Sequence, residues 1–98
     1  MISIVRFHPE AEKEFRESIL WYSKQQKGLE IEFVLSIDET IERIKRSPEQ
    51  FPKVYRHLRR AVIKKFPFVI LYELSLTDIN IVAIFHSKRN PQKVIKRR

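Results

Sequence analysis

The sequence predicts an α+β fold with an N-terminal strand and an α-helical hairpin packed on an antiparallel sheet. Two patterns predict it. Apolar residues recur at helical spacing in the first half of the chain, whereas short apolar and β-branched runs alternate with turn residues in the second half. The predicted element order is β-α-α-β-β-β, which is a two-layer architecture. A length of 98 residues and a hydrophobic content of 43% indicate a single domain, residues 1–98.

The first half of the chain supplies a strand and two helices. Residues 2–7 alternate as in a short strand, and Pro9 then suits the first turn of a helix. Gly28 lies where this helix should stop, because glycine adopts the left-handed cap conformation at little cost. A second amphipathic pattern begins at Leu29 and ends at the Ser-Pro pair 47–48. The positions expected to face the core are Ala11, Phe15, Ile19 and Tyr22 in the first helix and Phe33, Ile37, Ile41 and Ile44 in the second.

The second half of the chain is expected to form three further strands. Residues 58–65 mix β-branched and basic side chains. Residues 68–74 and 79–85 are nearly continuous apolar runs separated by a turn at 75–78, a pattern typical of a hairpin covered on at least one face. Residues 93–98 form a basic tail, for which we expect a solvated charged end.

Positive charge is concentrated in the second half of the chain. Residues 51–98 hold twelve Lys or Arg and two acidic residues, whereas residues 1–50 hold eight basic and ten acidic residues. The whole chain carries a formal net charge of +8 at pH 7. This asymmetry predicts a surface that binds a polyanion or an acidic partner. The cations expected to contribute to it are Arg59, Arg60, Lys64, Lys65, Lys88 and Arg89.

The composition argues against several kinds of site. The chain has no cysteine, which excludes disulfides and thiolate metal sites, and its single glycine, Gly28, excludes a glycine-rich phosphate-binding loop. The three histidines have no metal-ligand spacing, so we expect neither a metal nor a cofactor. No apolar run approaches the roughly 18 residues of a membrane span, and the N-terminus lacks the layout of a signal peptide. We therefore expect a cytoplasmic protein without membrane contact.

Short fragments in a fixed order and spacing run through nearly the whole chain. In sequence order they are Ala11 with Phe15, Trp21-Tyr22, Gly28-Leu29 with Phe33, Ile44 with Ser47-Pro48, Phe51-Pro52, Arg59-Arg60-Ala61, Phe66-Pro67-Phe68 with Tyr72, and Ile81 with His86, Lys88, Arg89 and Pro91. Taken together they resemble the RelE/ParE family of toxins from bacterial type II toxin–antitoxin modules, and more closely its ParE-like branch.

The resemblance implies the predicted fold and a toxic activity that a co-produced antitoxin silences by wrapping the toxin, so we expect a cognate antitoxin and a toxin–antitoxin hetero-oligomer. ParE-like members interfere with DNA gyrase, whereas RelE-like members cleave messenger RNA on the ribosome. RelE-like nucleases usually carry an arginine where this chain has Val69 and often a tyrosine where Ile95 lies, whereas Arg89 matches a basic position shared by many members. The resemblance therefore favours ParE-like growth inhibition through gyrase without catalysis.

A metal-free mRNA endonuclease is the alternative function. Such a reaction needs a base, an acid and cations around the scissile phosphate. His86 is the candidate for proton transfer because it ends the last predicted strand, three residues before Arg89, and Arg60 would be the second cation. A lone histidine in such a place is more often structural and bonds the backbone. A non-toxic, basic nucleic-acid-binding module is the third possibility.

Two pairs of adjacent residues are expected to divide between core and surface. Arg59 and Arg60 point to opposite faces if they lie in a strand, so one is expected to pair with a helix acid and the other to be left for a partner. Trp21 and Tyr22 lie about 100° apart on a helix, so one belongs to the core and the other is available to line a partner groove. The acids considered for the arginine are Glu14 and Glu17.

Overall fold

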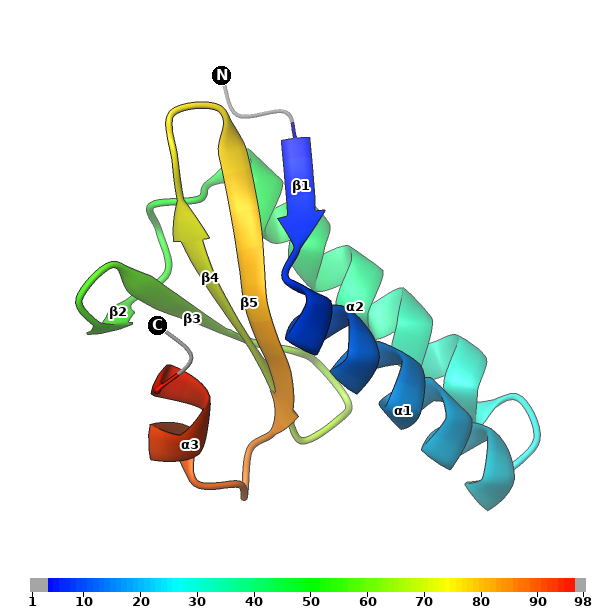
Figure 1. The fold of residues 1–98 in the computed structure, drawn as a ribbon. Helices are drawn as coiled ribbons and strands as arrows, with labels where there is room; N and C mark the ends of the chain where they lie inside the picture. Colours follow the sequence, from blue (N-terminus) through cyan, green and yellow to red (C-terminus); the bar gives the residue numbers. More distant parts are fainter. Residues whose placement is uncertain (1–3, 97–98) are drawn as a thin grey trace.

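The computed structural model describes residues 4–96, which form one mixed sheet with helices on both of its faces (Figure 1). The elements are β1 (Ile4–Phe7), α1 (Pro9–Gln25), α2 (Leu29–Arg46), β2 (Lys53–Tyr55), β3 (Leu58–Val62), β4 (Phe68–Leu74), β5 (Asp78–His86) and α3 (Pro91–Ile95). The strand order is β1-β5-β4-β3-β2. Neighbouring strands are antiparallel except β1, which runs parallel to β5.

The helices are divided between the two faces of the sheet. The antiparallel hairpin of α1 and α2 covers one face, and the short α3 lies on the opposite side (Figure 1). A parallel pair of strands needs a crossover connection. Here the chain between β1 and its partner β5 contains both long helices and the other three strands of the sheet. Because α1 begins directly after β1, which pairs with β5, the helix packs against β5.

The predicted α+β fold and helical hairpin are confirmed, with differences at the edges of the sheet. The pairing of β1 with β5 is parallel, not antiparallel. The three residues of β2 form an additional edge strand; all three are exposed, so the strand lacks the alternation of buried and exposed residues that predicts a strand. The predicted strand at 58–65 ends at Val62, because the chain turns there and Lys65 adopts a left-handed φ of 70°. Positions 2 and 3 of the first predicted strand lie outside the described residues.

The expectation of a solvated C-terminal tail is wrong for its first part. Residues 93–95 of the tail belong to α3, which begins before the tail. Pro91 occupies the first turn of this helix, and the Asn90 side chain accepts a hydrogen bond from the Gln92 amide at 2.9 Å. Val94 is fully buried against the sheet, which fixes the helix in place. Residues 97 and 98 of the tail lie outside the described residues.

Local sequence signals set the ends of the two long helices. At the start of α1, the His8 side chain accepts a hydrogen bond from the Glu10 amide at 3.3 Å, and Pro9 fills a position where no amide donor is needed. Gly28, with a φ of +89°, adopts the predicted left-handed conformation and directly precedes α2. Other residues adopt this conformation at a cost of about 1–2 kcal/mol, so glycine suits the sharp turn between the helices.

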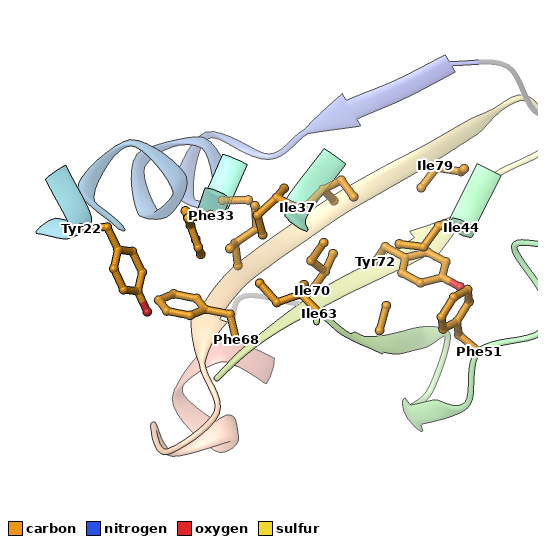
Figure 2. Close-up of a cluster of buried hydrophobic side chains, with 14 residues drawn as sticks. Tyr22, Phe33, Ile37, Ile44, Phe51, Ile63, Phe68, Ile70, Tyr72 and Ile79 are labelled. Atoms are coloured by element: carbon orange, nitrogen blue, oxygen red, sulfur yellow. The ribbon is translucent and has the colours of Figure 1, made fainter. Parts of the chain in front are cut away.

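The main core lies between the helical hairpin and the sheet (Figure 2). Phe33 of α2 is fully buried at its centre, with ring centroids 5.0 Å from those of Tyr22 and Phe68 in tilted and edge-on arrangements. Tyr22 is therefore the core member of the adjacent aromatic pair, and Trp21 is exposed. A second, smaller cluster lies on the opposite face and consists of Val69, Leu71, Ala83, Phe85 and Val94.

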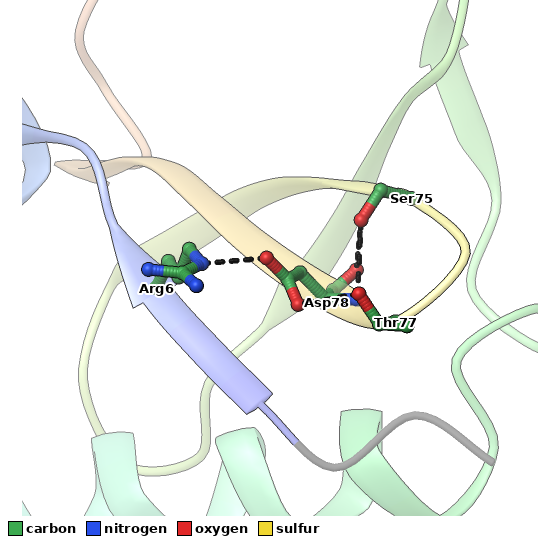
Figure 3. A network of polar contacts seen from close by, with 4 residues as sticks. All are labelled: Arg6, Ser75, Thr77 and Asp78. Atoms are coloured by element: carbon green, nitrogen blue, oxygen red, sulfur yellow. Dashed lines mark hydrogen bonds and ion pairs between the residues drawn. The ribbon is translucent and has the colours of Figure 1, made fainter.

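A polar network joins β1 to the turn that precedes β5 (Figure 3). Nε of Arg6 donates a hydrogen bond to Oδ2 of Asp78 at 2.5 Å, and the Thr77 hydroxyl donates to Oδ1 at 2.9 Å. The Asp78 amide donates to the Ser75 hydroxyl at 3.1 Å. The Arg6 and Thr77 hydrogen bonds lower the pKa of Asp78 below its usual value because they favour the carboxylate.

Replacing Asp78 should give a pH-dependent loss of stability. Because its folded-state pKa is lowered, the carboxylate stabilises the fold above its unfolded pKa of about 3.9, and this contribution is lost as pH falls through the folded-state pKa. Asp78→Asn should therefore unfold at lower urea concentration than the wild type at pH 7, with the difference shrinking under acid conditions. Asp38→Asn, on the exposed surface of α2, is the control. An Asp78→Asn deficit that is the same at pH 7 and pH 3 would contradict this assignment.

Candidate functional site

The face of the sheet that carries α3 is hollowed into a groove of about 410 Å³, which we call the back-face groove. Alternate residues of β3, β4 and β5 form its apolar floor, because successive side chains of a strand point to opposite faces. The floor residues are Val62, Val69, Leu71 and Phe85, with Pro91 and Ile95 contributed from α3. The cations that line the groove are Arg60 and Arg89.

The groove stays open because α3 is too short to cover the whole face. Val94 is buried beneath this helix, whereas Val62 on β3 remains 57% exposed. Arg60 is exposed beside it on the same face of the strand. An exposed apolar side chain such as Val62, with cations beside it, is typical of a surface that binds a partner with acidic and apolar residues.

A second hollow, of about 350 Å³, lies on the other face, between α1 and the end of β5. We call it the α1–β5 cavity. Its aromatic walls are Trp21 and Tyr22 of α1 and Phe68 of β4, and its polar lining residues are Glu14, Glu17, Ser18, His86 and Arg89. Arg89 lines both hollows, since it follows β5 at the end of the sheet where the two faces meet.

Glu14 connects the α1–β5 cavity to the sheet. β1 ends at Phe7, opposite Ile81, so the following residues of β5 are not paired by that strand. At Ile84, Oε1 of Glu14 takes the place of a strand neighbour and accepts the backbone N–H at 3.0 Å. Its other oxygen, Oε2, lies 3.6 Å from Nη1 of Arg89. A single buried carboxylate therefore satisfies a sheet amide and forms an ion pair with the guanidinium at the border of the cavity.

His86 is held by the backbone at the end of β5. Its Nδ1 accepts a hydrogen bond from the Lys88 amide at 3.1 Å, and its ring packs edge-on against Phe68 with centroids 5.4 Å apart. With Nδ1 as acceptor, the proton of the neutral imidazole is on Nε2. His86 is half-buried and shares the α1–β5 cavity with Arg89, whereas Arg60 lines the groove on the opposite face. Of the three residues of the alternative nuclease site, Arg89 thus shares one hollow with His86 and the other with Arg60, whereas His86 and Arg60 are separated by the sheet.

Arg59 points to the helical side of the sheet, away from Arg60. As the arginine on this side, it is the one expected to pair with Glu14 or Glu17 of α1, but that expectation is wrong. Its Nη1 donates instead to the carbonyls of Glu49 at 3.0 Å and Phe51 at 2.7 Å, because β3 passes beside the loop that follows α2. Of the two glutamates, Glu14 forms an ion pair with Arg89, and Glu17 is exposed. Arg59 therefore fastens the loop to the sheet.

The same region holds a buried phenol. The Tyr72 hydroxyl donates to the Pro48 carbonyl at 2.6 Å, and burial raises the pKa of Tyr72 to about 12 despite the opposing effect of Arg59. The phenol therefore remains protonated at physiological pH. Its hydrogen bond and that of Arg59 to Phe51 anchor the same loop from two neighbouring strands.

The three lysines of the predicted cationic set lie outside both hollows. Lys64 and Lys65 occupy the turn between β3 and β4, where Nζ of Lys64 lies 3.1 Å from Oε1 of Glu39 on α2. This pair is exposed and contributes little to stability. Lys88 is exposed in the turn after β5. The predicted cations are thus distributed over both faces of the sheet, and Arg60 and Arg89 are the two that border the back-face groove.

Within residues 4–96, the structure contains no group of three or more His, Cys, Asp or Glu side chains that could hold a metal ion. None of the helices described in this range is long and apolar enough to cross a membrane.

Comparison with known proteins identifies one family. Residues 5–91 match the sequence profile of the family described as "ParE toxin of type II toxin-antitoxin system, parDE". The chain belongs to this ParE toxin family. The match spans both long helices and every strand except the first residue of β1, and it includes Glu14, Arg60 and Arg89.

Individual relatives agree with the ParE family. "Toxin ParE2" of Mycobacterium tuberculosis, from strains CDC 1551 / Oshkosh and ATCC 25618 / H37Rv, is 24% identical over 91 residues, which cover 92% of this chain and 87% of the relative. A solved structure described as "Chromosomal ParDE TA system from P. aeruginosa" matches with a TM-score of 0.72 at 16% identity. That match covers 87% of this chain and 96% of the other, and it shows that the two chains share a fold.

Sequence reasoning missed the central role of Glu14 in this ParE toxin. The sequence pattern suggests Glu14 only as an ion-pair partner for Arg59 or Arg60, and it does not indicate a buried glutamate, because glutamate is rarely buried. The one available signal was its position one turn after Ala11 and one residue before Phe15, on the face that meets the sheet. The expected division of the adjacent aromatic pair is confirmed for the core, which Tyr22 enters, and Trp21 is the exposed member that lines the α1–β5 cavity.

Removing the Glu14 carboxylate should destabilise the fold. Glu14→Ala leaves the Ile84 amide without this acceptor, so the free energy of unfolding should fall by about 2 kcal/mol. Glu14→Gln keeps an acceptor oxygen and should lose less. Urea unfolding followed by circular dichroism measures both losses, with Glu17→Ala, on the exposed surface of the same helix, as the control. If Glu14→Ala is as stable as Glu17→Ala, the carboxylate does not hold the edge of the sheet.

Proposed function

We propose that this ParE toxin inhibits growth by acting on DNA gyrase in the cytoplasm and that a cognate antitoxin holds it inactive in a toxin–antitoxin hetero-oligomer. The single observation that carries the proposal is the match to the ParE family over residues 5–91. The relative from P. aeruginosa is described as part of a ParDE TA system, which supports an antitoxin partner for this chain as well.

The back-face groove supports an acidic, partly apolar antitoxin segment as its occupant. Its floor is apolar, and its two charged lining residues, Arg60 and Arg89, are both cations. The net charge of +8 also attracts an acidic partner at long range and speeds its association. Exposed apolar side chains such as Val62 would be removed from water in the complex.

The same groove supports inhibition without catalysis over RNA cleavage. Val69 and Ile95, at the positions where RelE-like nucleases carry an arginine and a tyrosine, both line the groove as apolar side chains. Among the described residues that line it, none is a His, Tyr, Asp or Glu that could transfer a proton. His86 lies across the sheet from Arg60, so these two residues do not face one phosphate from the same side.

Inducing the protein in bacterial cells, with and without the protein encoded beside it, tests the proposal. We expect filamentation, DNA-damage signalling and intact messages, with growth restored by co-expression of the neighbouring protein. In vitro, the purified toxin should inhibit supercoiling by gyrase. Rapid loss of translation with cleaved messages would show that the target is mRNA and not gyrase. Unaffected growth on induction would contradict the toxin function in that host.

Reversing the charge of Arg60 should weaken antitoxin binding. Arg60→Glu places a carboxylate at the border of the groove and should raise the Kd for the neighbouring antitoxin by at least about tenfold. Titration calorimetry measures the Kd. Lys24→Glu makes the same change in net charge on the exposed surface of α1 and controls for long-range attraction. Equal effects of the two variants would show that Arg60 acts only through the overall charge.

A further inference from the structure

The α1–β5 cavity has the features of a pocket for one side chain. It is separate from the back-face groove, and its volume of about 350 Å³ lies at the low end of the roughly 300–1,000 Å³ usual for ligand sites. Phe68 and Tyr22 form buried walls, and Ile84 contributes an aliphatic side chain from β5. A pocket of this size and lining suits a single large apolar group.

Trp21 forms the outer wall of the pocket and is the feature that most needs a partner. Its side chain is 57% exposed, although tryptophan carries a large apolar surface. The indole is nevertheless placed against the fold, because its ring lies edge-on to that of Tyr22 with centroids 5.0 Å apart. An exposed tryptophan that is already positioned loses little side-chain entropy when it is covered, which is why such residues often dominate binding energy.

The border of the pocket presents a cation to solvent. Arg89 is 53% exposed, whereas its partner Glu14 is only 10% exposed and is also bonded to the Ile84 amide. The guanidinium has five N–H donors, of which Glu14 orients one side, so its outer donors can bind a carboxylate bidentately. Glu17 and Glu14 both line the pocket, and two carboxylates disfavour entry of a phosphate group. They disfavour any other anion inside the pocket, so the pocket itself suits an uncharged group, and a carboxylate can be bound only at the exposed outer side of Arg89. A peptide segment can supply an apolar side chain and a carboxylate at these two places.

We propose that the α1–β5 cavity binds one large apolar side chain of the antitoxin, and that Arg89 binds an antitoxin carboxylate next to it. This proposal rests on the proposed function, because it takes the antitoxin as the occupant. Arg89 also lines the back-face groove, so a segment seated in the pocket reaches the second site around the end of β5. Glu14 acts as a positioning residue that keeps the guanidinium between the two sites.

The pocket can be observed directly, since Trp21 is the single tryptophan of the chain. The probe is the antitoxin encoded beside the toxin gene, titrated into the toxin while indole fluorescence is recorded. The same titration with Trp21→Ala toxin supplies the emission of any antitoxin tryptophan, which is subtracted. We expect a shift of the Trp21 emission to shorter wavelength on binding, because the antitoxin side chain removes the indole from water. An unchanged Trp21 emission in a complex that forms would overturn the proposal.

A matched pair of substitutions tests the energy of the contact. Trp21→Ala should raise the Kd for the antitoxin by at least about tenfold, whereas Leu20→Ala should change it by less than about threefold. Leu20 is the adjacent residue of α1, is 58% exposed and does not line the cavity. Ser18→Arg, which fills the pocket from a half-buried helix position, gives the same readout if Trp21→Ala proves less stable. Equal Kd values for Leu20→Ala and both pocket variants would overturn the proposal.

A double-mutant cycle tests the carboxylate. Each antitoxin Asp or Glu is replaced by its amide and combined with Arg89→Gln. One such pair should weaken binding by about tenfold less than the product of the two single effects. Arg16→Gln is the control, because Arg16 is also an exposed arginine paired with a glutamate of α1, Glu12, and lies outside the cavity. If no acidic position of the antitoxin is coupled to Arg89, then Arg89 does not bind an antitoxin carboxylate.

Failure of this proposal is distinguishable from failure of the proposed function. If the neighbouring protein forms no complex with the toxin, the antitoxin assignment itself is wrong. If it binds and restores growth while the pocket variants bind as Leu20→Ala does, the proposed function stands and the α1–β5 cavity is not part of the interface.

Discussion

The buried carboxylate of Glu14 joins the helical hairpin to the sheet at the place where β1 stops covering β5. A strand that continues past the end of its neighbour leaves amides without partners, and burying such an amide is costly. Glu14 supplies the acceptor from α1, at 3.0 Å from the Ile84 nitrogen. This contact places α1 over the end of β5 and so determines the walls of the α1–β5 cavity. It also places a negative charge 3.6 Å from Arg89, which would otherwise be a free side chain in a turn.

From this contact the arrangement of the candidate site follows. Arg89 lies where the two faces of the sheet meet, and each face carries a hollow to which it contributes. On one face the short α3 leaves an apolar groove with Arg60 at its border, and on the other face Trp21 and Tyr22 enclose a smaller pocket. The groove combines exposed apolar side chains with two cations, whereas the pocket combines an exposed tryptophan with Arg89 at its border and two glutamates in its lining.

The sequence carried enough information for most of the fold because its signals were local. The stripe through Phe33 and Ile37, the glycine at position 28 and the apolar runs of β4 and β5 each specify an element without reference to the rest. The parallel pairing of β1 depends on the far end of the chain, and α3 is anchored by the single side chain of Val94. Likewise, alternation predicted that Arg59 and Arg60 would face opposite ways, but the partner of Arg59 is a pair of loop carbonyls that no pattern indicates. The arrangement of the candidate site depends on contacts between segments that are distant in the sequence, and such contacts are the hardest to predict from a single sequence.

Amide hydrogen exchange at Ile84 tests the central claim most directly. The amide lies beyond the end of β1, and the Glu14 carboxylate accepts its hydrogen bond where a neighbouring strand would otherwise do so. The account predicts that Ile84 exchanges as slowly as the paired amides in the middle of β4 and β5 and that Glu14→Ala makes its exchange much faster while those amides change far less. An Ile84 amide that exchanges rapidly in the wild-type protein would contradict the account.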